Sequence, residues 1–428
     1  MQAYRAALFH LIDDPDVAGA GAYEHHRDGL LLVEDGVIVG CGAYAALAPR
    51  LGETPVIAFP GRLITPGFVD LHVHLPQTRA IAAHGEQLLD WLERHVFPAE
   101  AAFADPDHAA QAAEFFVTEI LRNGTTTAMV FGSSHKASVE ALFAQALRRG
   151  MRLIAGKVLM DRNAPAGLCD TVEDGRRETL ELIEAWSGRG RLGYAVTPRF
   201  AITSSPEQLA MAGEILAAHP QVWLQTHLAE NPAEIAATGA LFPAAADYLD
   251  VYQRFGLVGA RSVFAHCVHL DDSGFAHMAK AGAAVAFCPS SNLFLGSGLF
   301  DLKRACDHGV ALGLGTDVGA GTSFSLLHTM GEAYKVGQLR GDVLDPFKAF
   351  YLATLGGARA LSLDDKIGNL APGKEADFLV LDPAATPLLA HRLEGCEDLA
   401  EMLFALTILG DDRVVERTFI AGVLQHLR

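Results

Sequence analysis

The feature that most constrains this chain is a repeated alternation of amphipathic helices with short apolar runs. Apolar residues at helical spacing predict helices at 109–124, 139–150 and 206–219. Because strands that are apolar on both faces must be covered on both sides, the alternation predicts a parallel sheet flanked by helices. Eight such runs favour a closed (β/α)8 barrel over an open sheet. The runs are 68–75, 125–132, 152–160, 193–198, 222–230, 262–270, 283–292 and 310–317.

The two ends of the chain have a different, strand-and-turn texture. Residues 29–42 carry two β-branched runs around Asp35-Gly36, which is a hairpin signal. Residues 366–382 and 413–426 return to the same texture after the barrel. We therefore expect an α/β fold in which both chain ends combine into one small β-sandwich domain. The predicted division is 1–64 and 366–428 for the small domain and 65–365 for the barrel.

Composition excludes several classes of partner. The 428 residues include 33 Lys and Arg against 51 Asp and Glu, for a net charge of −18. Such an acidic chain repels phosphate backbones, so we expect no nucleic acid and no anionic membrane as partner. No run of about 18 apolar residues predicts a membrane span, and the first residues lack the apolar stretch of a signal peptide. The six cysteines form no CxxC pair, which indicates free thiols and a cytoplasmic protein.

Polar residues recur where the predicted strands end. His72 and His74 are two residues apart on one strand, so both imidazoles point to the same side. His227, His266 and Asp317 end three later strands, and the C-terminal strand ends of a barrel meet at one face. Any one of these residues alone has a structural explanation; Asp317, for example, can cap a following helix. Four strand ends that all supply metal-compatible groups favour a metal site.

Sequence motifs carry a more specific resemblance. PGFVDLHVH (66–74), together with the residues at the later strand ends, resembles the amidohydrolase superfamily. Within that superfamily, seven further motifs in the same order resemble the guanine deaminase family. They are HLPQ (74–77), WLERHVFPAE (91–100), TPRFAITSS (197–205), QTHLAE (225–230), FAHCVHL (264–270), CPSSN (288–292) and GLGTDVGAGTSFSLLHTM (313–330).

The resemblance implies a hydrolytic deamination of guanine to xanthine and ammonia. One zinc ion per chain, held by His72, His74, His227 and Asp317, activates a hydroxide that attacks C2 of the purine. Glu230 matches the glutamate that shuttles protons, and the alternative for it is a neighbour of a helix N-cap. His266 orients the hydroxide and stabilises its charge, while Asp317 also accepts the proton of the water. The resemblance implies a homodimer as well.

The resemblance also implies how the purine is read. Gln77, Arg199 and Phe200 match substrate-binding positions, because an amide and a guanidinium supply the hydrogen bonds that a lactam edge needs. The alternatives are a salt-bridged structural arginine for Arg199 and a solvated loop residue for Gln77. Trp91 and Phe97 are expected in the core rather than in the pocket.

Other activities stay open on the same fold. The fourth predicted strand, within 193–200, contains no lysine to bridge a second metal, so a one-metal site is favoured. A one-metal site also suits deamination of 8-oxoguanine, adenosine, cytosine or an s-triazine. A non-catalytic metal-binding protein is the alternative from another class, because a fold does not dictate an activity.

Overall fold

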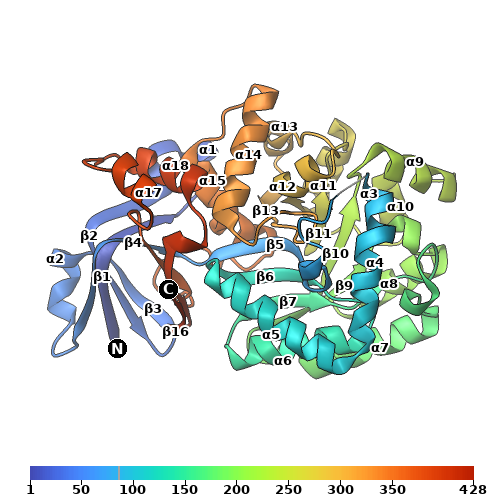
Figure 1. Ribbon diagram of the computed structural model, residues 1–428, viewed down its shortest axis with the longest axis horizontal. Helices are drawn as coiled ribbons and strands as arrows, with labels where there is room; N and C mark the ends of the chain where they lie inside the picture. Colours follow the sequence, from blue (N-terminus) through green and yellow to red (C-terminus); the bar gives the residue numbers. More distant parts are fainter. Residues whose placement is uncertain (85–86) are drawn as a thin grey trace.

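The central part of the chain forms a parallel barrel (Figure 1). The computed structural model describes residues 1–84 and 87–428. Within them, eight parallel strands follow one another around the barrel in sequence order, as predicted. They are β5 (Phe68–His74), β6 (Thr125–Phe131), β7 (Arg152–Gly156), β9 (Leu192–Pro198), β10 (Trp223–Leu228), β11 (Ser262–His266), β12 (Ala284–Phe287) and β13 (Ala311–Leu314). The short strand β8 (Val158–Leu159) pairs with β9 beyond the end of β7.

The last barrel strand comes back beside the first. Directly after β13, the Asp317 amide donates to the main-chain oxygen of His72 at 2.8 Å. The His74 amide donates in turn to the main-chain oxygen of Val318 at 3.0 Å. These bonds close the barrel at its C-terminal end, and they join the two segments that carry three of the predicted ligands.

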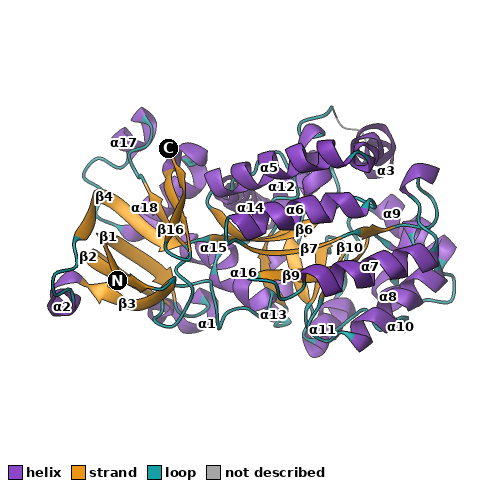
Figure 2. Ribbon diagram, turned by 90° about the horizontal axis from the view of Figure 1, so that it is seen from below, coloured by secondary structure: helices purple, strands orange, loops and turns teal. Residues whose placement is uncertain are grey.

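Helices surround the barrel strands (Figure 2). The predicted helices at 109–124, 139–150 and 206–219 correspond to α5 (Pro106–Arg122), α6 (Lys136–Arg148) and α8 (Pro206–Ala218). In α5, Asp105 caps the helix through the Asp107 amide, and the buried face repeats at Ala109, Ala113, Phe116 and Ile120. The remaining helices of this layer are α7 (Val172–Trp186), α9 (Pro232–Leu241), α10 (Tyr248–Arg254), α11 (Asp272–Ala281), α12 (Pro289–Phe294), α13 (Leu302–Asp307), α14 (Leu326–Arg340), α15 (Pro346–Ala353) and α16 (Leu355–Ala360).

The long connection from β5 to α5 crosses the C-terminal end of the barrel. We call its described residues, 75–84 and 87–104, the mouth segment. It contains a 3-10 turn at Leu75–Arg79, α3 (Leu88–Trp91), a wide π-turn at Leu92–Val96 and α4 (Phe97–Ala101). The elements α3, the π-turn and α4 follow one another without a break over residues 88–101, and a 3-10 turn at Ala102–Ala104 ends the run. The π-turn shifts the positions that share a face, so the run has no regular helical period in the sequence.

Both chain ends build a separate sheet of seven strands in the order β16-β15-β14-β4-β1-β2-β3, counted over the described residues. The fold class predicted from the sequence is therefore confirmed. The predicted hairpin lies between β2 and β3, with positive φ at both Asp35 and Gly36, as a tight turn of this kind requires. The strands are β1 (Gln2–Leu11), β2 (Tyr23–Glu34), β3 (Val37–Ala43), β4 (Val56–Pro66), β14 (Phe378–Leu381), β15 (Val415–Ile420) and β16 (Val423–Leu427), with the short helices α1 (Pro15–Ala18) and α2 (Tyr44–Leu47) between them.

A helical excursion interrupts the C-terminal part of this sheet. Between β14 and β15, the chain forms α17 (Pro387–Arg392) and α18 (Leu399–Leu409), and α18 packs against the barrel helices α14 and α15. Both helices fall within residues 366–428 of the predicted small domain. The boundaries of the two domains at residues 65 and 365 stay a prediction.

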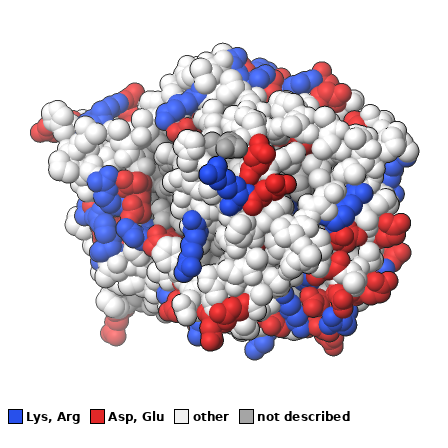
Figure 3. All heavy atoms as spheres, turned by 45° about the vertical axis from the view of Figure 1, so that its right-hand side comes forward, with Lys and Arg blue, Asp and Glu red and all other residues white. Residues whose placement is uncertain are grey.

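Two features of the whole molecule bear on partners. Among the described residues, no helix has the length and apolarity to cross a membrane. On the face drawn in Figure 3, the acidic and basic side chains of the described residues are interspersed rather than gathered into a basic field. All six cysteines, which lie in the described part of the chain, are free as expected.

Candidate active site

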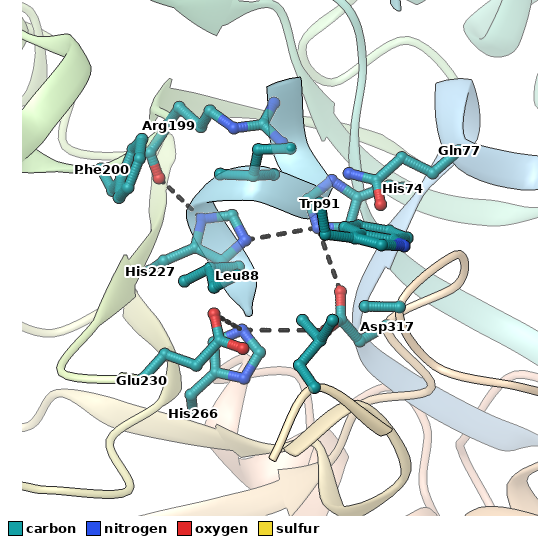
Figure 4. A pocket seen from close by; sticks show the side chains of 13 residues that line it. His74, Gln77, Leu88, Trp91, Arg199, Phe200, His227, Glu230, His266 and Asp317 are labelled. Carbon is teal, nitrogen blue, oxygen red and sulfur yellow. Dashed lines mark hydrogen bonds and ion pairs between the residues drawn. The ribbon is translucent and has the colours of Figure 1, made fainter. Parts of the chain in front are cut away.

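The predicted metal-site residues meet at the C-terminal end of the barrel; we call His72, His74, His227, His266 and Asp317 the strand-end cluster. The Nε2 atom of His74 lies 3.1 Å from that of His72 and 3.3 Å from that of His227. One carboxylate oxygen of Asp317 lies 3.2 Å from Nε2 of both His72 and His74. Nε2 of His266 lies 3.8 Å from the other oxygen of Asp317. Figure 4 shows four of these side chains directed toward one another.

Burial and neighbouring groups shift the pKa values of His74, His227 and Asp317. Burial lowers the pKa of His74 to about 3, and burial together with the neighbouring imidazoles lowers the pKa of His227 well below its ordinary value. Burial alone would raise the pKa of Asp317, but the adjacent imidazoles of His72 and His74 hold it well below its usual range. Neutral imidazoles beside an ionised carboxylate are the protonation states in which these residues bind a metal.

The cluster has the donor set of a divalent cation site. Nδ1 of His227 donates to the main-chain oxygen of Arg199 at 2.7 Å, so its Nε2 carries a lone pair that faces His74. The ligating atoms of His72, His74 and His227 lie within 4.8 Å of one another. Nε2 of His266 is buried and has no hydrogen-bond partner within the described residues. Several nitrogen lone pairs and a carboxylate therefore converge, and a cation such as zinc fits them.

A second metal would need a bridging lysine close to the cluster. The fourth barrel strand, β9, has none, as the sequence predicted. Lys157, which follows β7, is fully buried, but its ammonium lies against the carboxylates of Asp170 and Glu178 and donates to the main-chain oxygen of Ser134. That ammonium is already committed away from the strand-end cluster, which agrees with a one-metal site.

Glu230 lies beside the cluster and is 3% exposed. One of its carboxylate oxygens, Oε1, accepts a hydrogen bond from the Ser297 hydroxyl at 3.1 Å, and the other, Oε2, lies 3.5 Å from Nε2 of His266. Burial, reinforced by the charge of Asp317, raises the pKa of Glu230 to about 8. The structure thus places Glu230 in the pocket beside the strand-end cluster, and its role as proton shuttle stays a prediction.

A buried network holds the backbone of Glu230. Glu234, in the first turn of α9, accepts hydrogen bonds from the amides of Glu230 at 2.8 Å and Asn231 at 3.2 Å, and from the Tyr248 hydroxyl at 2.7 Å. Asn231 is the N-cap of α9 and forms a capping box with Glu234. Glu230 is therefore a neighbour of a helix cap, as its alternative explanation held, and its side chain still points into the pocket (Figure 4).

His266 is oriented from behind by Asn292 of α12. Its Nδ1 lies 2.9 Å from the side-chain oxygen of Asn292, and an amide oxygen only accepts hydrogen bonds. The Nδ1 atom consequently carries the proton in the neutral imidazole, and the lone pair of Nε2 faces Glu230 and Asp317. Asn292 ends the CPSSN motif, but the sequence analysis gave it no role.

A small pocket opens above the cluster. The lining side chains are His74, Gln77, Leu88, Trp91, Leu92, Arg199, Phe200, His227, Glu230, His266, Leu295, Asp317 and Ala320. All three predicted substrate-binding residues thus line it. Gln77 and Arg199 are each 2% exposed, and Phe200 is 4% exposed. Gln77 is therefore buried rather than a solvated loop residue, and its side-chain oxygen accepts from the Gly319 amide at 3.3 Å.

Trp91 is buried, at 1% exposure, in an apolar cluster, as expected, and it also borders the pocket. Its indole N–H has no hydrogen-bond partner among residues 1–84 and 87–428. Phe97 packs in an apolar cluster, as expected. Apolar side chains over short helices are ambiguous in sequence, because a pocket wall and a core have the same composition.

Arg199 is a salt-bridged arginine, as its alternative explanation held, and its role in substrate binding stays a prediction. Its guanidinium makes a buried ion pair with Glu100, with Nη1 2.6 Å from a carboxylate oxygen, and it also lines the pocket. Sequence reasoning missed Glu100, Asn292, Glu234 and Ser297. The first two lie inside motifs already quoted, FPAE and CPSSN, so the motifs themselves were the signal that could have found them.

Comparison with known proteins assigns the family. The model of the amidohydrolase family matches residues 63–424. The chain therefore belongs to the amidohydrolase family. It is 50% identical over 418 residues to the guanine deaminase of Escherichia coli (strain K12), a match that covers 97% of this chain and 95% of that protein.

Solved structures agree with this assignment along the whole chain. The structure of E. coli guanine deaminase matches with a TM-score of 0.98 at 49% identity and covers 100% of both chains. A guanine deaminase from C. acetobutylicum, solved with guanine bound in its active site, matches with a TM-score of 0.89 at 28% identity and covers 99% of both chains. The resemblance stated from the motifs is thus confirmed.

Proposed function

We propose that this chain is an enzyme that hydrolyses guanine to xanthine and ammonia. The observation that carries the proposal is the convergence, in one small pocket, of the strand-end cluster, the buried acid Glu230 and the paired guanidinium of Arg199. A relative that is 50% identical over nearly the full length is a guanine deaminase, which supports the same activity.

We assign the metal as one zinc ion per chain, with His72, His74, His227 and Asp317 as its ligands. Three imidazoles and a carboxylate form a donor set that suits zinc. When bound, zinc lowers the pKa of water to about 7 and so makes a nucleophile available at neutral pH. Asp317 also lies within 3.8 Å of His266, so the two side chains can share the hydrogen bonds of an attacking water.

Glu230 moves the protons. Its Oε1 is held by Ser297, so Oε2 is the oxygen free to take a proton from the attacking water. The same oxygen delivers that proton to the ring nitrogen next to C2. It then carries the proton left on the attacking oxygen to the 2-amino group, so that the bond between C2 and this nitrogen breaks, ammonia leaves and the C2 carbonyl of xanthine forms. The raised pKa of about 8 lets this carboxyl both accept and release a proton near neutral pH.

His266 directs the attack. Because Asn292 fixes the proton on Nδ1, the lone pair of Nε2 accepts a hydrogen bond from the attacking water. This contact orients the water toward C2.

Arg199 and Gln77 recognise the purine, and Phe200 bounds the pocket beside them. A guanidinium donates to the lactam oxygen O6, and the carboxamide of Gln77 donates and accepts along the neighbouring ring edge. Adenine carries an amino group where guanine carries O6, so Arg199 would face a donor and be left without a partner. Buried donors left unpaired in this way discriminate by as much as about 10⁴–10⁵-fold.

A deamination panel tests the substrate. Guanine, 8-oxoguanine, adenine, adenosine, cytosine and an s-triazine are each incubated with the zinc-loaded protein, and ammonia release is measured together with ultraviolet spectra. We expect turnover of guanine and none of adenine or cytosine. An inert guanine beside active adenosine or cytosine would contradict the proposal and remove the roles given to Gln77 and Arg199.

The metal assignment has its own test. Elemental analysis of the active protein should give one zinc per chain, and two ions per active chain would contradict the one-metal site.

The homodimer and the cytoplasmic location stay predictions. Measurement of the mass of the native protein in solution tests the homodimer.

A further inference from the structure

A buried ion pair joins Arg199, which lines the pocket, to Glu100 of the mouth segment. Glu100 is fully buried and Arg199 is 2% exposed, and their charged groups approach to 2.6 Å. The second carboxylate oxygen of Glu100 has no hydrogen-bond partner in the part of the chain that the structure describes. A buried charge without solvent or a partner is strongly unfavourable, so each member of the pair depends on the other.

The mouth segment clamps the guanidinium from one turn of helix. Phe97 and Glu100 are three residues apart on α4 and therefore share a face. The Phe97 ring centroid lies 5.6 Å from the guanidinium carbon of Arg199, while Glu100 binds its edge. The Ser133 hydroxyl donates to the main-chain oxygen of Glu100 at 2.9 Å, which ties this turn to the segment after β6. The plane of the guanidinium is thus fixed before any ligand arrives.

The pair also decides the charge that a ligand meets. A lone guanidinium in a buried pocket attracts anions strongly, because the local dielectric constant is low. Beside Glu100 the net charge of the pair is zero, yet the guanidinium N–H groups not used by Glu100 remain donors. Such a site offers hydrogen bonds to a carbonyl oxygen without offering a positive charge to an anion.

We propose that Glu100 is a positioning and specificity residue that holds Arg199 and cancels its charge, so that the pocket selects a neutral lactam over an anionic heterocycle. This inference rests on the proposed function. It has a consequence for the reaction, because xanthine, with a second carbonyl group, is more acidic than guanine. As the xanthine anion forms, Glu100 weakens its binding and favours its release.

The test compares a neutral with an ionisable purine. Hypoxanthine has the same lactam edge as guanine but no 2-amino group to lose, and xanthine ionises as the pH rises from about 6 to about 8. Binding of both to the zinc-loaded protein is measured by calorimetry at these two pH values, and guanine kinetics are measured in parallel. In the wild type, xanthine should bind more weakly at the higher pH while hypoxanthine changes little.

Glu100→Gln keeps the shape and one acceptor for Arg199 but leaves the guanidinium charge uncompensated. We expect xanthine at about pH 8 to gain at least about tenfold in affinity relative to hypoxanthine, as expected for an uncancelled buried charge. The kcat/KM for guanine should fall by about tenfold, mostly through KM, because a charged hydrogen bond is weakened. Glu119→Gln removes a carboxylate that pairs with Arg122 on α5, away from the pocket, and serves as the matched control.

A second variant separates charge from position. Glu100→Asp keeps the charge but is one methylene shorter, so it should raise KM for guanine while the discrimination against the xanthine anion persists. An unchanged xanthine-to-hypoxanthine affinity ratio in Glu100→Gln, or equal ratios in both variants, would overturn the inference. If guanine is not turned over but the charge preference shifts as expected, the proposed function fails and the role of Glu100 stands. If guanine is turned over without that shift, only the role of Glu100 fails.

Discussion

The pocket has two walls of different construction. The inner wall is made of strand ends, and its side chains, the strand-end cluster, are held by the hydrogen bonds that close the barrel. The outer wall is made of the mouth segment, whose short helices present Leu88, Trp91 and Leu92 to the same space. Rigid strand ends suit reacting groups that must hold their geometry, whereas short helices adapt to the shape of a ligand.

Backbone strain adds to the difference. His266 and Asp317 have φ values of 72° and 51°, in the left-handed region that non-glycine residues rarely adopt. Such conformations cost about 1–2 kcal/mol each and persist where surrounding contacts enforce them. The comparison therefore teaches that changes in the inner wall should act on kcat, and changes in the outer wall on KM.

Glu230→Gln keeps the shape of the inner wall and removes its proton transfer. We expect kcat for guanine to fall by at least about 10²-fold, the lower range for general acid–base catalysis, with zinc content unchanged. Steady-state kinetics and elemental analysis of the same preparation check both. Loss of metal in this variant would instead make Glu230 a ligand or a structural residue. Its assignment to proton transfer, separate from the metal ligands, would then be wrong.

Asn292→Ala removes the acceptor that orients His266. Without the bond from Nδ1, the imidazole can rotate or change tautomer, and we expect kcat to fall by about tenfold, as for a lost hydrogen bond to a reacting group. KM and zinc content should stay within about twofold of the wild type. A change confined to KM would show that His266 reads the substrate, which breaks the proposed division of the two walls.

Trp91→Phe removes the unpaired indole N–H of the outer wall and keeps an aromatic ring. If the pocket uses this donor for its ligand, KM should rise by several-fold, consistent with about 1 kcal/mol for a neutral hydrogen bond, while kcat is preserved. Guanine kinetics measure both parameters. A fall in kcat at constant KM would place Trp91 functionally with the inner wall.

Glu234→Gln probes the support behind Glu230 through the pH dependence of stability. Burial raises the pKa of Glu234 from 4.5 to about 7. Between these values the folded protein binds a proton that the unfolded chain has released, so this group makes the wild type less stable as the pH rises through that window. Glutamine does not ionise, so the Glu234→Gln variant does not lose stability in this way.

Urea unfolding of the zinc-loaded proteins between about pH 5 and about pH 8 measures the difference. The free energy of unfolding of the variant minus that of the wild type should increase by about 1 kcal/mol or more up to about pH 7 and then level off. A difference that does not change with pH would show that Glu234 is ionised throughout and that burial does not control it.

The two walls also differ in how many of their residues could be predicted from the sequence. His72, His74, His227 and Asp317 were predicted to meet, because strands have a period of two and the ends of parallel strands share one face. The structure brings them within hydrogen-bond distance. Glu230, Gln77 and Arg199 were found through motifs, and they line the same pocket.

The contacts of the outer wall could not be predicted from the sequence, for physical reasons. Trp91 was assigned to the core because a buried pocket wall and a core have the same apolar residues. The Glu100–Arg199 pair joins residues 99 positions apart, and nothing in the local pattern of either one specifies the other. The helix α18 was not predicted, because the segments on both sides of it have the pattern of strands. Its packing against α14 and α15 depends on tertiary contacts that the local sequence does not specify.

Arg199 contacts both walls, but through different atoms. Its main-chain oxygen holds the His227 ring at 2.7 Å, and its guanidinium reaches Glu100 and the pocket. A main-chain carbonyl is common to all twenty amino acids, so a substitution at this position leaves the partner of His227 in place. Substitution of the side chains at positions 199 and 100 therefore changes the group that faces the pocket while the main-chain contact to His227 stays in place.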